Sequence, residues 1–110
     1  MINEAKLEEI MLELGHPEHL AGTDFLRQAV VLYEGGKRQM CNEVYPALAA
    51  AANTSTIAVE RNMRHSLERA WSRGSLDAQY RFFGHSINPE TGRPTLGEYV
   101  ARLARICHEN

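Results

Sequence analysis

The polar face of one stretch of the chain, residues 54–74, gathers side chains that can bind charged or polar partners. Its titratable members are Glu60, Arg61, Arg64, His65 and Glu68. An arginine can donate two parallel hydrogen bonds to O6 and N7 of guanine, and a carboxylate such as Glu60 can accept one from the amino group of cytosine. The hydroxyls of Thr54, Ser55 and Thr56, with the free N–H groups of a helix start, suit phosphate oxygens. The chemistry open to this stretch is recognition of double-stranded DNA.

The same charges have a simpler explanation, which is a solvated helix face. Glu60 and Arg64, and then Arg64 and Glu68, are four residues apart, the spacing of stabilising ion pairs on a helix. Arg61, Arg64 and His65 lie within about one turn, however, where like charges destabilise a helix. DNA would supply the counter-charge that the protein lacks. On pattern alone the solvated face is slightly favoured, because helices arranged in this outline occur in many domains that bind no DNA.

The segments before this stretch have helical signals, and strand signals are nearly absent. A first helix ends at Gly15 and Pro17, and its apolar residues recur at i, i+3, i+4 and i+7 as Leu7, Ile10, Met11 and Leu14. A second helix is capped by Thr23 or Asp24 and breaks at Gly35-Gly36. Its apolar positions are Phe25, Leu26, Ala29, Val30 and Tyr33.

The stretch itself forms the second half of a predicted helix-turn-helix at about residues 43–74. A short helix has Pro46 in its first turn and ends at Asn53, a residue that tolerates the left-handed conformation. After a turn, with Thr54, Ser55 or Thr56 as the N-cap, a longer helix runs to Gly74. Its apolar stripe is Val59, Met63, Leu67, Ala70 and Trp71. A short helix, a tight turn and a longer helix with an arginine-bearing outer face are typical of a helix-turn-helix.

The remaining segments complete an all-α fold. A short helix after Gly74 is expected to turn Leu76, Tyr80 and Phe83 inward, and residues 85–94 form an irregular loop. The last helix opens with a capping box between Thr95 and Glu98. Its apolar positions are Leu96, Tyr99, Val100, Leu103 and Ile106. The sequence therefore predicts one helical domain over residues 1–110, a compact bundle of about six helices.

Bulk properties narrow the class of protein. The 110 residues are enough to bury one core, and 44% hydrophobic with 24% charged residues is typical of a soluble globular protein. The formal net charge of −2 excludes a strong nonspecific nucleic-acid binder, so any basic surface must be local. No apolar run is long enough for a bilayer and the N-terminus is unlike a signal peptide, so we expect a cytoplasmic protein with no membrane partner. Cys41 and Cys107 have no CxxC partner and are interpreted as reduced core thiols.

Catalytic motifs are missing from the sequence. It contains no GxSxG, no phosphate-binding glycine loop and no dinucleotide-binding fingerprint. His16, Glu18 and His19 surround Pro17 in a predicted surface turn, where spacing places no third zinc ligand. We expect no enzymatic activity, no cofactor and no metal site. A small metal- or ligand-binding domain that uses this turn is the least favoured alternative.

Several separated blocks agree in order and spacing with one known family. The central block is "VYPALAAAANTSTIAVERNMRHSLERAWSRG", with Val59-Glu60-Arg61, Arg64-His65 and residues 70–74 as its signature. The others are "LGHPEHLAGTDFLRQAV", Phe83-Gly84 and Arg93-Pro94-Thr95. From about Leu7 to Ile106, the chain resembles the C-terminal DNA-binding effector domain of the sporulation stage-zero factor A family, the master response regulators of endospore formation.

The resemblance implies a sequence-specific transcription regulator. A helix at about residues 56–73 would enter the major groove of a short operator element near promoters. Glu60, Arg61 and Arg64 would face bases, whereas His65 and the Thr54, Ser55 and Thr56 turn would face the DNA backbone, with Arg93 as a weaker backbone candidate. RNA polymerase is a candidate second partner. We expect a monomer in free solution that pairs in tandem on adjacent operator sites.

Two features keep a second hypothesis open. Ala58 stands where the family commonly has a basic residue, and no receiver domain or phosphoacceptor aspartate accompanies these 110 residues. The chain would then be either an excised domain or a free-standing relative under another kind of control. The alternative function is a helical protein-interaction module that has kept the fold and lost specific DNA binding.

Overall fold

Helices make up the fold of the computed structural model, which describes residues 1–84, 87 and 90–109. In these residues there are six α-helices and one π-helical turn: α1 (Glu4–Glu13), α2 (Ala21–Glu34), η1 (Met40–Val44), α3 (Tyr45–Ala52), α4 (Thr56–Arg73), α5 (Leu76–Phe83) and α6 (Leu96–Cys107). The predicted all-α bundle is confirmed. Within the loop expected at 85–94, His85, Ser86, Asn88 and Pro89 lie outside the described residues.

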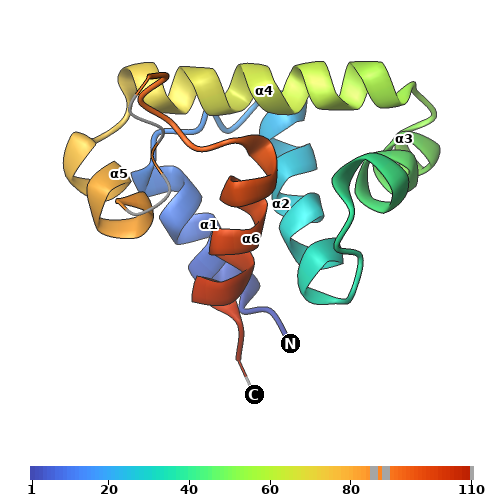
Figure 1. Ribbon diagram of the computed structural model, residues 1–110, viewed down its shortest axis with the longest axis horizontal. Helices are drawn as coiled ribbons and strands as arrows, with labels where there is room; N and C mark the ends of the chain where they lie inside the picture. Colours follow the sequence, from blue (N-terminus) through green and yellow to red (C-terminus); the bar gives the residue numbers. More distant parts are fainter. Residues whose placement is uncertain (85–86, 88–89, 110) are drawn as a thin grey trace.

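The longest helix, α4, spans one edge of the molecule (Figure 1). The three helices α1, α2 and α6 stand below it, with α3 beneath its first turns and α5 beneath its last. A continuous hydrophobic core joins these elements, and within it Phe83 of α5 stacks on Tyr99 of α6, with ring centroids 5.0 Å apart. Trp71, predicted on the apolar stripe of its helix, is partly buried and packs edge-on against both rings. The bundle therefore supports α4 along its whole length.

The local signals that begin and end helices are largely confirmed. Pro46 lies in the first turn of α3, Asn53 adopts the left-handed conformation with φ 53°, and Thr95 with Glu98 forms the predicted capping box. The cap predicted for the second helix is wrong: α2 begins at Ala21 after Leu20, without a side-chain cap. Thr23 instead contacts Ser66 of α4, with Oγ1 and Oγ 2.8 Å apart, so a tertiary contact uses the hydroxyl.

The inward face predicted for α5 is wrong at two of three positions. Phe83 is buried, but Leu76 is 67% exposed and Tyr80 is 63% exposed. Gln79 takes the inward position and donates from Nε2 to the carbonyl oxygens of Ala70 (3.5 Å) and Trp71 (3.2 Å). The Ala70 carbonyl also accepts from the Gly74 N–H (2.6 Å), whereas the Trp71 carbonyl lies in the last turn of α4, where intrahelical partners run out. The need of the Trp71 carbonyl for a donor turns a polar residue inward.

The two cysteines differ from each other in environment. Cys107 is buried in the core as predicted, whereas Cys41 is exposed in η1 and is not a core thiol. In the part of the chain that the structure describes, no helix combines the length and apolar character needed to cross a bilayer.

The two ends of the chain meet at the end of the molecule opposite α4 (Figure 1). Ile2 and His108 form an isolated antiparallel bridge. On either side of it, the Asn3 N–H donates to the Cys107 carbonyl (2.8 Å) and the Glu109 N–H to the Met1 carbonyl (2.7 Å). This pairing ties the start of α1 to the end of α6.

Candidate nucleic-acid interface

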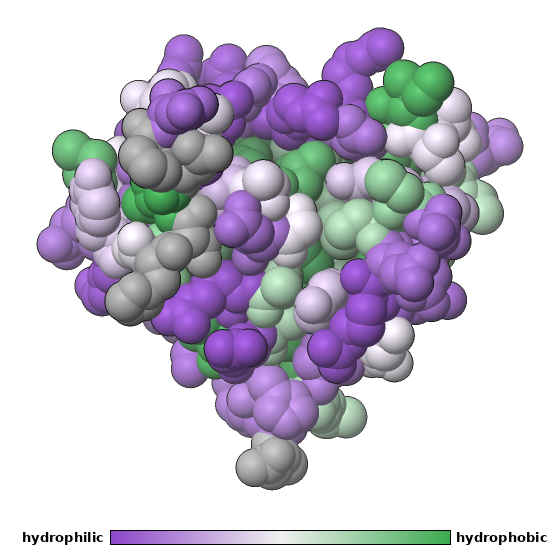
Figure 2. Space-filling view, viewed as in Figure 1, coloured by the Kyte–Doolittle hydropathy of each residue, from purple (hydrophilic) through white to green (hydrophobic). Residues whose placement is uncertain are grey.

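The exposed face of α4 brings the predicted site residues together. Arg61, Arg64 and His65 are exposed, and Glu60 is partly exposed, on the side opposite the core. The buried residues of the same helix are Val59, Met63, Ser66, Leu67 and Ala70. The helix thus separates a packing side from a polar side, and Figure 2 shows a mainly hydrophilic surface along this edge of the molecule. A polar helix face at the edge of a bundle can enter the major groove, which is wide enough for one α-helix.

The turn before α4 presents hydroxyls and amides at the start of that face. The Thr54 N–H donates to the Ala49 carbonyl (3.0 Å), which closes the end of α3. Ser55 is the N-cap, and its Oγ accepts from the Ala58 N–H (3.0 Å). Its O–H remains able to donate, as do the hydroxyls of the exposed Thr54 and Thr56. The first N–H groups of the helix precede its first backbone hydrogen bond and point outward, which suits an anion.

The charges of the face form weak pairs. Arg64 Nη2 contacts Glu60 Oε1 at the expected i, i+4 spacing. Glu68 pairs with Arg93 (Nη2 to Oε2, 3.0 Å) and not with Arg64. In the described part of the chain Arg61 has no ion-pair partner. Half-exposed pairs of this kind are worth about 0 to 1 kcal/mol, so an incoming anion can replace the carboxylates.

Positive charge is concentrated on this helix. The sequence of α4 holds four arginines and two glutamates, whereas the whole chain has a net charge of −2. The expectation that any basic surface must be local agrees with this distribution. A helix with this excess of arginine on an acidic chain favours one orientation of approach to a polyanion.

Arg93 reaches the face from a distant part of the sequence. Its ion pair with Glu68 holds the segment before α6 against the middle of α4. Between this segment, η1 and α4 lies an open pocket of about 390 Å³, with Tyr45 and Cys41 in its lining. Burial raises the pKa of Tyr45 to about 12, and the nearby Glu60 carboxylate adds to the shift. The phenol therefore keeps its proton at neutral pH. No sequence signal indicated that Tyr45 lies beside the predicted site.

Close backbone contacts fix the position of α4 on the bundle. A Cβ built on Gly22 of α2 would lie 1.8 Å from the Asn62 carbonyl oxygen of α4, so only glycine fits there. At the other end, a Cβ on Gly74 would lie 2.0 Å from the Leu14 carbonyl oxygen. In its first half and just after its end, α4 is therefore in close contact with the backbone of its neighbours. Backbone cannot move aside as a flexible side chain can.

A buried histidine, which the sequence did not reveal, links α4 to the rest of the bundle. His16 was expected in a surface turn, but it is only 4% exposed. Its Nδ1 lies 2.8 Å from the Ser66 Oγ, and its Nε2 contacts the Tyr99 hydroxyl. Burial lowers the pKa of His16 to about 4, so the ring is neutral at neutral pH. Glu18 and His19 of the same turn are exposed, as predicted.

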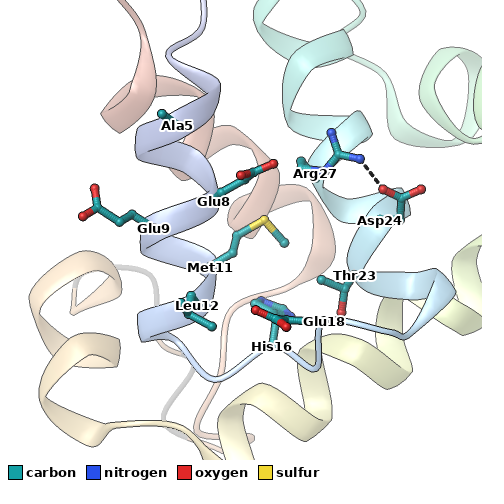
Figure 3. A pocket seen from close by; sticks show the side chains of 10 residues that line it. All are labelled: Ala5, Glu8, Glu9, Met11, Leu12, His16, Glu18, Thr23, Asp24 and Arg27. Atoms are coloured by element: carbon teal, nitrogen blue, oxygen red, sulfur yellow. Dashed lines mark hydrogen bonds and ion pairs between the residues drawn. The ribbon is translucent and has the colours of Figure 1, made fainter.

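The histidine lies at the base of a second pocket, of about 500 Å³, between α1 and the start of α2 (Figure 3). Four acidic residues, Glu8, Glu9, Glu18 and Asp24, are among the residues that line it, and Asp24 is paired there with Arg27. Among the described residues, no three histidine, cysteine, aspartate or glutamate side chains converge as a metal site would require. Both ring nitrogens of His16 are engaged within the protein, so its role is to join helices.

One comparison with known proteins bears on the helix-turn-helix. A family model described as "Sporulation initiation factor Spo0A C terminal" matches residues 7–106. The match begins in α1 and ends in α6, so it includes α3, the turn and α4.

Proposed function

We propose that this chain, which belongs to the family of the sporulation initiation factor Spo0A C-terminal domain, is a transcription regulator that inserts α4 into the major groove of a short promoter operator. It would act as one helical effector domain, with the helix-turn-helix at about residues 43–74. The family is one of DNA-binding sporulation regulators and not of enzymes. The observation that supports the proposal best is the exposed polar face, with Arg61 and Arg64 on it, of a helix held rigidly across one edge of the bundle.

Three side chains would read base edges. Arg61 has no ion-pair partner in the described part of the chain, so its guanidinium is free to donate two parallel hydrogen bonds to one guanine. Arg64 would leave Glu60 for a second guanine, since the half-exposed pair costs little to break. The released Glu60 carboxylate could then accept from a cytosine amino group.

Five residues would hold the helix on the phosphate backbone. The hydroxyls of Thr54, Ser55 and Thr56 and the first amides of α4 would contact one phosphate at the start of the helix. His65 would contact the backbone beside the groove. Arg93 would contact the backbone from the segment before α6, exchanging Glu68 for a phosphate.

Fluorescence anisotropy of a labelled duplex tests the proposal. The family's operator element and a scrambled duplex are titrated across a salt series. Only the salt dependence separates the sequence-specific contribution to the binding free energy from the electrostatic one. We expect at least a few hundredfold preference for the operator. Arg61→Ala or Arg64→Ala should cost about 1 to 3 kcal/mol and relax base preference without loss of fold. Arg105→Ala, an exposed arginine of α6, is the matched control and should change little.

Equal and weak binding of both duplexes at every salt concentration would overturn the proposal. Arg61, Arg64 and His65 would then form a solvated face, and a protein-interaction module would be the better description of the chain.

We also propose that the domain is a monomer in free solution and pairs on adjacent operator sites, where RNA polymerase is the candidate second partner. Sedimentation with a single-site and a tandem-site duplex distinguishes these states. A stable dimer without DNA would contradict this part of the proposal.

A further inference from the structure

An exposed apolar side chain stands at the start of the proposed DNA-reading face. Ile57, the second residue of α4, is 69% exposed. In Figure 2 a hydrophobic patch interrupts the hydrophilic edge near the end where α4 begins. A single exposed isoleucine is ordinary on a protein surface, so its position has to decide whether it has a role.

The position of Ile57 is central on the polar side of the helix. Successive residues of an α-helix are about 100° apart around its axis. Ile57 therefore lies within about 40° of Arg61 and about 20° of Arg64. The buried side of α4, from Val59 to Ala70, points the other way.

The first turn of a recognition helix is also the part that comes closest to base edges. Ser55 caps this turn, and the early amides and hydroxyls around it would fix it to a phosphate. That contact would place the Ile57 side chain among the base edges of the major groove, on the same side of the helix as Arg61.

The major groove offers one apolar group to such a side chain. The C5 methyl of thymine is the only aliphatic group on the edges of the four bases there, and apolar side chains read it by contact. The neighbouring Arg61 and Arg64 can donate to guanine but cannot match a methyl group. We infer that Ile57 is a specificity-determining residue that reads a thymine methyl group in the operator. This inference rests on the proposed function of the α4 face.

The test begins with a random duplex pool, from which the duplexes that bind the wild-type chain are enriched and sequenced. Each thymine of the enriched duplex is then replaced in turn by uracil, which removes the methyl group and keeps the hydrogen-bonding edge. Burial of one methyl-sized group is worth about a fourfold change in affinity. We expect one thymine whose replacement weakens wild-type binding about fourfold, and the effect should vanish in Ile57→Ala.

Leu76→Ala is the matched control, because Leu76 is 67% exposed and also stands at a helix start after a capping serine. It should retain the full response to uracil. Circular dichroism checks that each variant is folded.

The outcomes separate the two proposals. If no duplex is enriched over the pool, the proposed function fails and the inference fails with it. If a specific duplex is enriched but no uracil weakens binding, or the loss is the same in Ile57→Ala, the inference is overturned while the proposed function stands. A uracil effect that depends on Ile57 and not on Leu76 supports both.

Discussion

Stability should fall in mild acid because of one buried ring. His16 has a pKa of about 4 in the folded chain, against 6.5 for an ordinary histidine, and burial is the cause. The unfolded chain therefore binds one more proton than the folded chain between these two pH values. This contribution to stability is complete above pH 6.5, falls as the pH is lowered towards about 4, and changes no further below that.

The size of the effect follows from the width of this window. Each pH unit across it costs about 1.4 kcal/mol, so acidification from pH 7 to 4 should remove about 3 kcal/mol of the free energy of unfolding. That is a large share of the stability of a domain of this size. Protonation would also turn the accepting ring nitrogen into a donor, so the hydroxyl of Ser66 or Tyr99 that donates to it would have to reorient and accept.

Urea unfolding followed by circular dichroism and Trp71 fluorescence, at half-unit steps from pH 7.5 to 4, measures this dependence. The matched variant is His16→Gln, whose amide can donate and accept but does not titrate. The difference between the two curves removes the contribution of the carboxylates, which titrate in both proteins. The exposed His19 serves as the control, because His19→Gln should reproduce the wild-type slope.

Two results would refute this account of His16. One is a wild-type slope that persists unchanged in His16→Gln. The other is an imidazole signal of His16 in NMR that titrates near pH 6.5, which would mean that the folded chain accommodates the charged ring.

Two further predictions concern the support of α4 and its edge. Gly22→Ala should destabilise the chain by about 1 to 3 kcal/mol or more in urea unfolding, because its Cβ would overlap the backbone of α4. The control is Gly97→Ala, which is also at the second position of a helix but whose Cβ would make only an ordinary contact with Met40, so it should be neutral or stabilising. Equal losses of stability in the two variants would contradict the close approach of α2 to α4. Arg93→Ala should weaken binding to operator and scrambled duplexes alike and reduce the salt slope by about one, measured by anisotropy, whereas a selective loss on the operator would assign Arg93 to a base.

The helices and the composition of the α4 face could be predicted because their signals are local. Val59, Met63 and Leu67 recur at the helical period, and the same period places Arg61 and Arg64 on the opposite side. Ser55 caps α4 by accepting from the Ala58 N–H, and Asn53 ends α3 by donating to the Ala49 carbonyl. These partners are three and four residues away, so the turn between α3 and α4 can be predicted from the local sequence.

The features that could not be predicted depend on distant partners. His16 meets Ser66 and Tyr99, which are 50 and 83 residues away, and no periodic pattern marks a single residue in a turn. Thr23 had the sequence signature of a helix cap, but its hydroxyl forms a hydrogen bond with the Ser66 hydroxyl of α4 instead. Gln79 is inward because the end of α4 needs donors, which overrides the apolar pattern of α5.

The pairing of Ile2 with His108 brings the first and last described residues of the chain side by side. Because the ends already touch, a short linker between them would span almost no distance and add little entropic cost. New ends could then be opened at the exposed turn around Gly36, where a Cβ would meet nothing within 4 Å. In such a circular permutant α1 would follow α6 directly, and every helix would keep its neighbours. The order of the helices along the chain is thus separable from the packing that presents α4.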